Sequence, residues 1–274
     1  MDLLEEMQAH VVLGDAAVGT QLLAAGIPPG SCLEELCVSR PELVLGIHEQ
    51  SIAAGARVIR TNSFGANSVR LGSFGHERRV GELNWAAAQL ARTAAKGQNV
   101  LVAGSVGPLG GAALPGVRKR VFEDQIGALL DGGAQLILLE TFQVLEEILV
   151  AVEVKHTLHH CPVICCLACD DAGRLSDGTT LAAAFDMLRA AGADVVGVNC
   201  TAHPEDLPTL FAGHAFEKPL AAFPSAGIQH ELMPDAFARI GLALIDQEIR
   251  LVGGCCGTTA AHIEALAGAL RDRQ

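Results

Sequence analysis

Short, continuously apolar runs recur along this chain of 274 residues at a spacing of roughly 30 to 35 residues. They are rich in Val, Ile and Leu, and they do not alternate with polar residues, which is typical of parallel strands buried on both faces. The runs expected to be strands cover residues 11–13, 56–60, 100–103, 135–139, 163–168, 193–198, 220–223 and 249–252. This repetition constrains the fold more than any other feature of the sequence.

Segments that favour helix separate the apolar runs. Pro41 is expected to begin a helix that ends near Ala54, because proline suits the first turn of a helix. Further helices are expected over residues 77–96, 119–131, 145–158, 181–190, 235–247 and 260–270, with a short one near residue 204. Residues 32–40 and 109–116 are expected to be irregular. Eight such units predict a single-domain (β/α)8 TIM barrel over residues 1–274.

The composition and net charge of the chain exclude several classes of function. Aromatic residues make up only 4% of the chain and hydrophobic residues 50%, so the core must be built from Ala, Val, Leu and Ile. A net charge of −12 argues against a partner that is a nucleic acid or an anionic membrane. No apolar run approaches the roughly 20 residues of a membrane helix. The first residues are acidic, whereas a signal peptide begins with basic residues. The chain is therefore expected to be cytoplasmic, with its nine cysteines present as thiols or metal ligands.

In barrels of this kind the catalytic and binding residues lie at the carboxyl ends of the strands. Those positions hold three thiols, two carboxylates and several small polar groups: Asp15, Asn62, Ser105, Glu140, Asn199, Cys200, Ser225, Cys255 and Cys256. Because parallel strands end at one face of the barrel, all of them are expected around one mouth. Asn62 and Asn199 fit either ligand binding or the bracing of loops by hydrogen bonds.

Two adjacent cysteines, Cys255 and Cys256, follow the last apolar run and are flanked by glycines. Neighbouring strand residues point to opposite faces, so the chain must bend if both are to act at one point, and glycine allows such a bend. With Cys200 at another strand end they form a candidate zinc site with an open fourth position. The alternative is that these small residues fill the core. Three thiolates suit a metal that holds a substrate thiol as thiolate, which indicates chemistry at sulfur.

The remaining cysteines and histidines are expected to be structural. Cys165, Cys166 and Cys169 lie in or just after one strand, where alternation separates neighbours, so core packing is the favoured interpretation. Cys32 and Cys37 receive no role. The histidines at positions 156, 159 and 160 follow a helix end and are expected to be solvated there. Thr258 or Thr259 is expected to be the N-cap of the last helix.

Several segments, taken together and in order, resemble the homocysteine S-methyltransferase family, which includes the homocysteine-binding barrel of cobalamin-dependent methionine synthase. A similar barrel is fused to methylenetetrahydrofolate reductase in some bacterial proteins. The matching segments are Gly14-Asp15 with Gly19-Thr20, Thr61-Asn62-Ser63-Phe64-Gly65-Ala66-Asn67, Leu139-Glu140-Thr141-Phe142, Gly197-Val198-Asn199-Cys200 and Gly253-Gly254-Cys255-Cys256-Gly257-Thr258-Thr259. The last segment is the most specific, and the likeness covers nearly the whole chain.

The resemblance implies a zinc-dependent methyltransferase. Cys200, Cys255 and Cys256 would bind Zn²⁺, the zinc would bind the homocysteine sulfur, and that thiolate would attack a donor methyl group to give methionine. Asp15 and Glu140 would hold the substrate's ammonium or orient its amino-acid end. Substrate binding would also involve Asn62, and backbone groups around Ser105 would meet the substrate carboxylate.

The resemblance leaves the donor open between methylfolate or methylcobalamin on a partner protein or domain and a small sulfonium such as S-methylmethionine or S-adenosylmethionine. Betaine is disfavoured, because its quaternary ammonium needs aromatic rings. The chain has no tyrosine, and its one tryptophan, Trp85, is expected to pack within a helix. Ser225 stands where methionine synthase barrels commonly have an asparagine, which puts a resting metal ligand there in doubt. Other readings are a non-catalytic zinc- or thiol-binding module of a larger assembly, or a related substrate such as selenohomocysteine.

Overall fold

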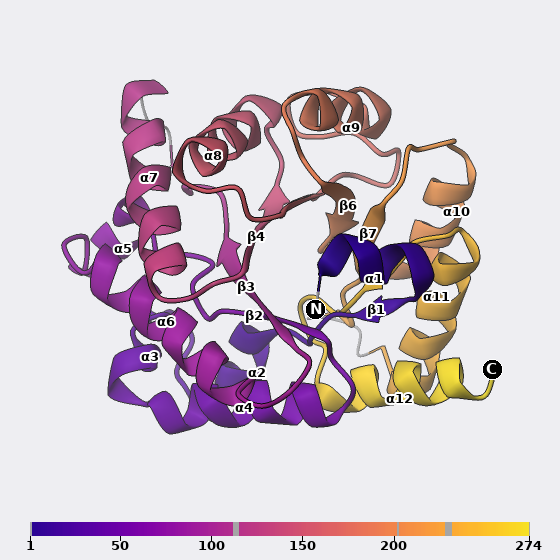
Figure 1. Cartoon of the computed structure of the whole chain (residues 1–274), viewed down its shortest axis with the longest axis horizontal. Coiled ribbons are helices and arrows are strands. Elements are labelled where there is room, and N and C mark those ends of the chain that lie inside the picture. The colour runs from indigo at the N-terminus through magenta and orange to yellow at the C-terminus, as the bar shows by residue number, and fades with distance from the viewer. Residues whose placement is uncertain (1, 112–114, 202, 228–231, 274) are drawn as a thin grey trace.

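The computed structural model describes residues 2–111, 115–201, 203–227 and 232–273. Within them eight parallel strands form one sheet in the order β1-β8-β7-β6-β5-β4-β3-β2. A parallel bridge between Gly14 and Val58 joins β1 to β2 and brings the two ends of the sheet together. Helices surround this ring of strands (Figure 1). The predicted (β/α)8 barrel is confirmed.

The strands are short, and their order along the chain matches the predicted one. Their bounds are β1 Val12–Leu13, β2 Val58–Arg60, β3 Leu101–Val106, β4 Leu136–Phe142, β5 Val163–Leu167, β6 Val195–Asn199, β7 Leu220–Phe223 and β8 Leu251–Val252. The strands β3 and β4 run three residues beyond their expected ends, so Ser105 and Glu140 lie within strands rather than just after them.

The helices that follow the strands also match the expected pattern. Their bounds are α4 Pro41–Ala53, α6 Val80–Ala94, α7 Pro115–Asp131, α8 Leu145–Leu158, α9 Leu181–Ala190, η1 Pro204–Asp206, α10 Leu207–Ala212, α11 Pro234–Asp246 and α12 Ala260–Arg271. Part of the loop expected over residues 109–116 lies outside the described residues.

Four short helices fall in segments that the sequence pattern did not predict as helical: α1 Leu3–Ala9, α2 Val18–Ala24, α3 Leu36–Ser39 and α5 Ser68–Gly72. The expectation that residues 32–40 are irregular is therefore wrong for α3. None of these helices exceeds seven residues, so each offers at most two turns of periodicity from which to recognise it.

The helix α1 packs against the inside of the barrel. Asp2 accepts hydrogen bonds from the backbone amides of Leu4 and Glu5 at 2.9 and 3.2 Å and so caps the helix. Leu3 and Met7 are 1% and 2% exposed and pack with inward-facing strand residues such as Val12 and Val58. This helix supplies apolar side chains to a barrel interior that is poor in aromatic residues.

The strand residues divide between two apolar layers. In β5, Cys165 packs in the layer between sheet and helices, whereas its neighbour Cys166 packs in the barrel interior. Both are fully buried, which confirms the core assignment. Trp85 departs from expectation, because it is 50% exposed on α6 although it lies mid-helix. All nine cysteines are free thiols, and no helix in the described ranges is both long and apolar enough to cross a membrane.

Candidate active site

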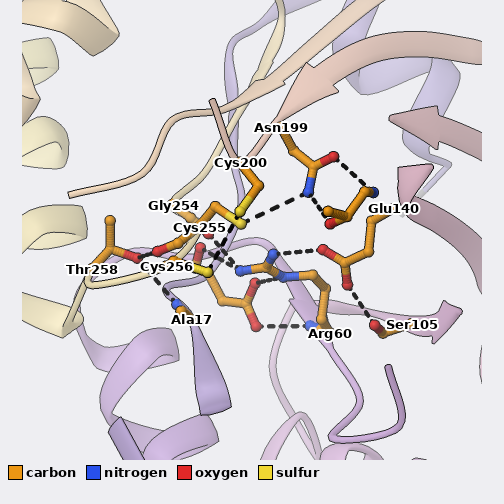
Figure 2. Close-up of polar contacts among 12 residues, drawn as sticks. Ala17, Arg60, Ser105, Glu140, Asn199, Cys200, Gly254, Cys255, Cys256 and Thr258 are labelled. Atoms are coloured by element: carbon orange, nitrogen blue, oxygen red, sulfur yellow. Dashed lines mark hydrogen bonds and ion pairs between the residues drawn. The ribbon is translucent and has the colours of Figure 1, made fainter. Parts of the chain in front are cut away.

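Three cysteines from two strand ends meet at the mouth of the barrel. Cys200 directly follows β6, while Cys255 and Cys256 lie in the turn after β8. The Sγ atoms of Cys200 and Cys256 are 3.5 Å apart, and all three sulfur atoms lie within 4.8 Å of one another (Figure 2). Among the described residues, no other three His, Cys, Asp or Glu side chains come together in this way.

The backbone conformations at these ends turn the sulfurs toward one point. Cys200 has a φ of 56°, a left-handed conformation that side chains other than glycine rarely adopt. Gly257 has a φ of 83° and lies against the backbone of Gly227, where a side chain would not fit. Strain of this kind at a non-glycine residue is typical of functional sites. The bend that the flanking glycines predict after β8 is confirmed.

Hydrogen bonds hold the cysteine turn to the rest of the mouth. The Thr258 hydroxyl donates to the Cys255 carbonyl at 2.7 Å and accepts from the Ala17 amide at 3.1 Å. The Asn199 amide nitrogen lies 3.7 Å from the Cys255 sulfur and 2.7 Å from the Thr141 hydroxyl. Thr258 therefore braces the turn, and Thr259 is the residue at the N-cap of α12.

The sulfur geometry fits a tetrahedral metal ion. A Zn–S bond of about 2.3 Å places two sulfur ligands about 3.8 Å apart at the tetrahedral angle. The 3.5 Å contact and the 4.8 Å limit bracket that separation. The three cysteines would occupy three positions of a tetrahedral ion, so the fourth position would be free for a ligand from the cavity.

Without a metal, all three thiols hold their protons at neutral pH. The pKa of Cys255 is raised to about 12, first by its hydrogen bond with Cys200 and then by burial. For Cys200, the hydrogen bond with Cys255 lowers the pKa, but the hydrogen bond with Cys256 and burial raise it, to about 11. For Cys256, the hydrogen bond with Cys200 lowers the pKa, but the hydrogen bond with Cys255 and burial raise it, also to about 11. A metal that binds here must therefore displace protons.

Arg60 joins the two predicted carboxylates into one network. Its Nε donates to Asp15 Oδ1 at 2.7 Å and its Nη1 donates to Glu140 Oε2 at 3.0 Å. Its Nη2 donates to the Gly254 carbonyl at 2.6 Å, and its guanidinium carbon lies 5.1 Å from the centre of the Phe223 ring. Figure 2 shows Arg60 between the cysteine turn and Glu140.

The network keeps a charged arginine in a buried position. Burial lowers the pKa of Arg60, but the Asp15 and Glu140 carboxylates outweigh it and hold the pKa above its ordinary value. Burial raises the pKa of Asp15, and Arg60 opposes that shift. The Ser105 hydroxyl donates a short hydrogen bond to Glu140 Oε1. Both oxygens of each carboxylate thus already have a partner within the protein.

The other predicted polar residues mostly brace loops. The Asn62 amide nitrogen donates to the Leu33 carbonyl at 2.7 Å, and Asn199 exchanges hydrogen bonds with Thr141. The Ser105 amide donates to the Thr61 hydroxyl at 2.9 Å. Ser225 is 5% exposed. Bracing accounts for these contacts of Asn62 and Asn199, and the binding roles of Asn62 and Ser105 stay predictions.

A cavity of about 490 Å³ opens at this mouth. The sulfur wall consists of Cys200, Cys255 and Cys256, and the charged wall consists of Arg60, Ser105 and Glu140. The apolar and outer parts of the lining include Val18, Leu23, Leu33, Glu34, Phe64 and Arg70. Asn62 also lines the cavity, whereas Asp15 does not and is only 1% exposed. The volume is within the range of small-molecule sites.

Arg60 is the residue that sequence reasoning missed. It ends the run Val58-Ile59-Arg60, where a cation follows two fully buried aliphatic residues. A charge in such a position must be paired, because an isolated buried charge is costly. That signal predicts a buried partner for Arg60, and the structure supplies Asp15 after β1 and Glu140 in β4.

Comparison with known proteins agrees with this geometry. A family model described as homocysteine S-methyltransferase matches residues 12–270. The chain belongs to the homocysteine S-methyltransferase family. Each of the segments that carry the resemblance in the sequence contributes residues to the lining of the cavity.

Curated relatives in the family include methionine synthases. The chain is 32% identical over 303 residues to the methionine synthase of Mycobacterium tuberculosis and 31% identical to that of Mycobacterium leprae. Each alignment covers 98% of this chain but only 25% of the relative. The chain therefore spans about a quarter of the length of these relatives.

Solved structures give the same family. The metallated form of the homocysteine methyltransferase MmuM from Escherichia coli matches with a TM-score of 0.82 at 27% identity and covers 96% of this chain and 97% of its own. The carboxyl transferase domain of Rhizobium etli pyruvate carboxylase matches with a TM-score of 0.57 at 16% identity, a likeness that shows the fold alone.

Proposed function

We propose that this protein transfers a methyl group to the sulfur of homocysteine, with a zinc ion held by Cys200, Cys255 and Cys256. The observation that carries the proposal is the convergence of three thiols, within 4.8 Å of one another, on one wall of a cavity. When bound, zinc would lower the pKa of a substrate thiol, so that homocysteine is present as a thiolate at neutral pH.

The chain's own residues would hold and orient the reactants. The charged wall lies next to the sulfur wall, since Arg60 donates to the carbonyl of Gly254, directly before Cys255. An amino acid whose sulfur lies at the cysteines therefore meets Arg60 and Glu140 with its polar end. Holding the thiolate and the donor methyl in line would supply much of the rate.

The size of the cavity bears on the methyl donor. About 490 Å³ admits homocysteine and a second small molecule, which supports a small sulfonium as donor. A corrinoid is too large to enter and would have to present its methyl group from outside, on a partner protein or a further domain. The similarity to methionine synthases over a quarter of their length supports testing that route as well.

The test is a donor panel with purified protein, zinc and homocysteine, in which methionine formation is measured. The donors are S-methylmethionine, S-adenosylmethionine, methyltetrahydrofolate and methylcobalamin. We expect turnover with at least one of them, and its loss when a chelator removes the metal. Binding of zinc and homocysteine with no methionine from any donor would contradict the proposal and favour a binding module.

A further inference from the structure

We propose that two charged side chains in the outer part of the cavity, Arg70 and Glu34, recognise the methyl donor. Arg70 binds the carboxylate of the donor, and Glu34 lies against its cationic centre. The donor class that fits both groups is a small sulfonium that also carries a carboxylate. The inference rests on the proposed function, because it concerns how the second substrate of the same reaction is held.

Two of the four charged side chains that line the cavity have no ion-pair partner. Arg60 and Glu140 are joined at 3.0 Å. Glu34 and Arg70 also line the cavity, but neither has an oppositely charged group within 4.0 Å among the described residues. The outer part of the cavity therefore presents one unpaired anion and one unpaired cation, and a zwitterionic ligand carries the complementary charges.

Arg70 is held through one edge of its guanidinium only. Asn67 caps α5 by accepting from the amides of Val69 and Arg70 at 3.1 and 3.0 Å. Arg70 Nε donates to the Pro108 carbonyl at 2.9 Å, and the guanidinium carbon lies 5.1 Å from the centre of the Phe64 ring. Nη1 and Nη2 have no hydrogen-bond partner among the described residues. Four N–H donors thus remain for a ligand, and a carboxylate can accept two of them side by side.

Glycines make room for both side chains at the mouth. A Cβ atom at Gly110, whose φ is 80°, would lie 2.9 Å from Arg70 Nε. A Cβ atom at Gly65 would lie 2.6 Å from Glu34 Oε1 and 3.3 Å from Arg70 Cδ. The two charged side chains therefore reach the same place beside Gly65 only because no side chain stands there. This close packing distinguishes them from charges on a solvated surface.

Glu34 offers a negative charge in apolar surroundings. Its Oε1 accepts from the Gly65 amide at 2.8 Å, and its Oε2 lies 3.7 Å from Cys32 Sγ. The apolar side chains of the outer cavity are Val18, Leu23, Leu33 and Phe64. A sulfonium carries its charge within a shell of methyl and methylene groups, so it fits apolar walls with one carboxylate. Phe64 is the one aromatic residue of the lining, and Arg70 already lies over its ring.

The outer position of these groups suits a donor whose methyl group faces the sulfur wall. Homocysteine held at the inner walls leaves the outer part of the cavity to the second substrate. In the transfer, the homocysteine thiolate forms the new S–C bond and the donor's S–CH₃ bond breaks. The electron pair of that bond stays on the donor sulfur, which becomes a neutral thioether. Glu34 attracts the cationic donor but not the neutral product, so the charge change favours product release.

The experiment compares S-methylmethionine with (3-aminopropyl)dimethylsulfonium, which keeps the sulfonium and the amine but lacks the carboxylate. Dissociation constants are measured by calorimetry on the zinc-loaded protein without homocysteine, so that no methyl transfer occurs. We expect the wild type to bind S-methylmethionine about tenfold more tightly, since Arg70 is half-buried and a charge-assisted hydrogen bond there is partly screened. Equal binding of the two sulfoniums, or binding of neither, would overturn the proposal.

Variants then locate the effect. Arg70→Gln should weaken S-methylmethionine binding about tenfold and leave the truncated sulfonium within about twofold, while Arg70→Lys restores part of the preference because it keeps the charge. Glu34→Gln keeps an oxygen for the Gly65 amide, so it should weaken both sulfoniums about fivefold and preserve their ratio. Arg40→Gln, at an exposed pair with Glu42, is the matched control and should change neither constant.

Homocysteine binding distinguishes the outer part of the cavity from the inner walls. Arg70→Gln and Glu34→Gln should each leave the dissociation constant of homocysteine within about twofold of the wild-type value. Retention of zinc stoichiometry and of the circular dichroism spectrum shows that a variant is folded. If Arg70→Gln weakens homocysteine as much as it weakens S-methylmethionine, Arg70 belongs to the acceptor site and the proposal is wrong.

Two outcomes separate this proposal from the proposed function. If neither sulfonium binds while methionine forms from methyltetrahydrofolate or methylcobalamin, the methyl transfer stands and the donor site does not. If the sulfoniums bind with the expected preference but no donor yields methionine, the site at Arg70 and Glu34 stands and the methyl transfer does not.

Discussion

The two walls of the cavity differ in how far their polar groups are already paired within the protein. In the sulfur wall the three thiols interact mainly with one another, and the Asn199 amide lies 3.7 Å from the Cys255 sulfur. In the charged wall every carboxylate oxygen of Glu140 and of the supporting Asp15 already has a donor within the protein. The geometry of the first wall could hold a metal ion, whereas the carboxylates of the second are already paired within the protein.

This difference predicts different responses to mutation. Removing a cysteine takes away a ligand but leaves no buried charge behind, so metal and activity should suffer more than stability. Removing a member of the charged wall leaves a buried partner uncompensated, so stability should suffer first.

The largest effect is expected for Cys256→Ala. The change removes one of three ligands from a half-buried side chain, so we expect loss of stoichiometric zinc and a fall in methyl transfer of about 1,000-fold or more, with the fold retained. Metal analysis measures the bound zinc, methionine formation measures methyl transfer, and circular dichroism measures whether the fold is retained. A variant that keeps full activity without bound metal would falsify the sulfur wall as the metal site.

The next effect is on metal affinity as a function of pH. Because the metal-free thiols have pKa values of about 11, 12 and 11, three protons leave when the metal binds at neutral pH. Affinity should therefore rise with pH, by up to about 1,000-fold per pH unit. Competition with a chromophoric chelator at several pH values near neutrality gives the slope. A slope near zero would mean that the thiols are already ionised without the metal, and that their pKa values are not raised.

The support of the charged wall is tested by Asp15→Asn, because Asp15 pairs with Arg60 without lining the cavity. The substitution keeps the shape but removes the charge opposite a buried Arg60, so we expect a loss of about 3 kcal/mol in the free energy of unfolding while zinc is retained. Denaturant unfolding of the metal-free protein measures the first effect, and metal analysis the retained zinc.

The control for that loss is Asp246→Asn, which removes the partner of Arg273 at an exposed pair. It should cost less than about 1 kcal/mol. If both variants lose the same small amount, the network around Arg60 contributes no more than a surface ion pair. The contrast between the walls would then disappear.

The sequence predicted the barrel and the sulfur wall well, for a physical reason. Apolar runs recur with regular spacing, and a rule of parallel sheets places their carboxyl ends at one mouth. Cys200, Cys255 and Cys256 therefore converge whatever the details of the loops. The helices that were missed, α1, α2, α3 and α5, have seven residues or fewer, and their positions depend on tertiary packing.

The charged wall was predicted only in part. Strand ends identified Asp15 and Glu140, and both lie at the mouth, but their partner was overlooked because Arg60 is the last residue inside a strand. The structure pairs both carboxylates with Arg60, and their predicted role in holding the substrate's ammonium stays a prediction. Which of two carboxylates faces the cavity depends on side-chain packing, which spacing along the chain does not encode.

The smallest effect on metal content and methyl transfer is expected for Cys165→Ala, which is the matched control for Cys256→Ala. Cys165 is the same residue type in another barrel strand, but it is fully buried within β5 and packs between sheet and helices. Replacing its sulfur leaves a small cavity, so we expect a loss of about 1–2 kcal/mol in stability with zinc content and methyl transfer unchanged. Loss of zinc in this variant would show that removing any buried thiol disturbs the metal site. The position of a cysteine at a strand end, rather than its presence in the barrel, would then no longer explain metal binding.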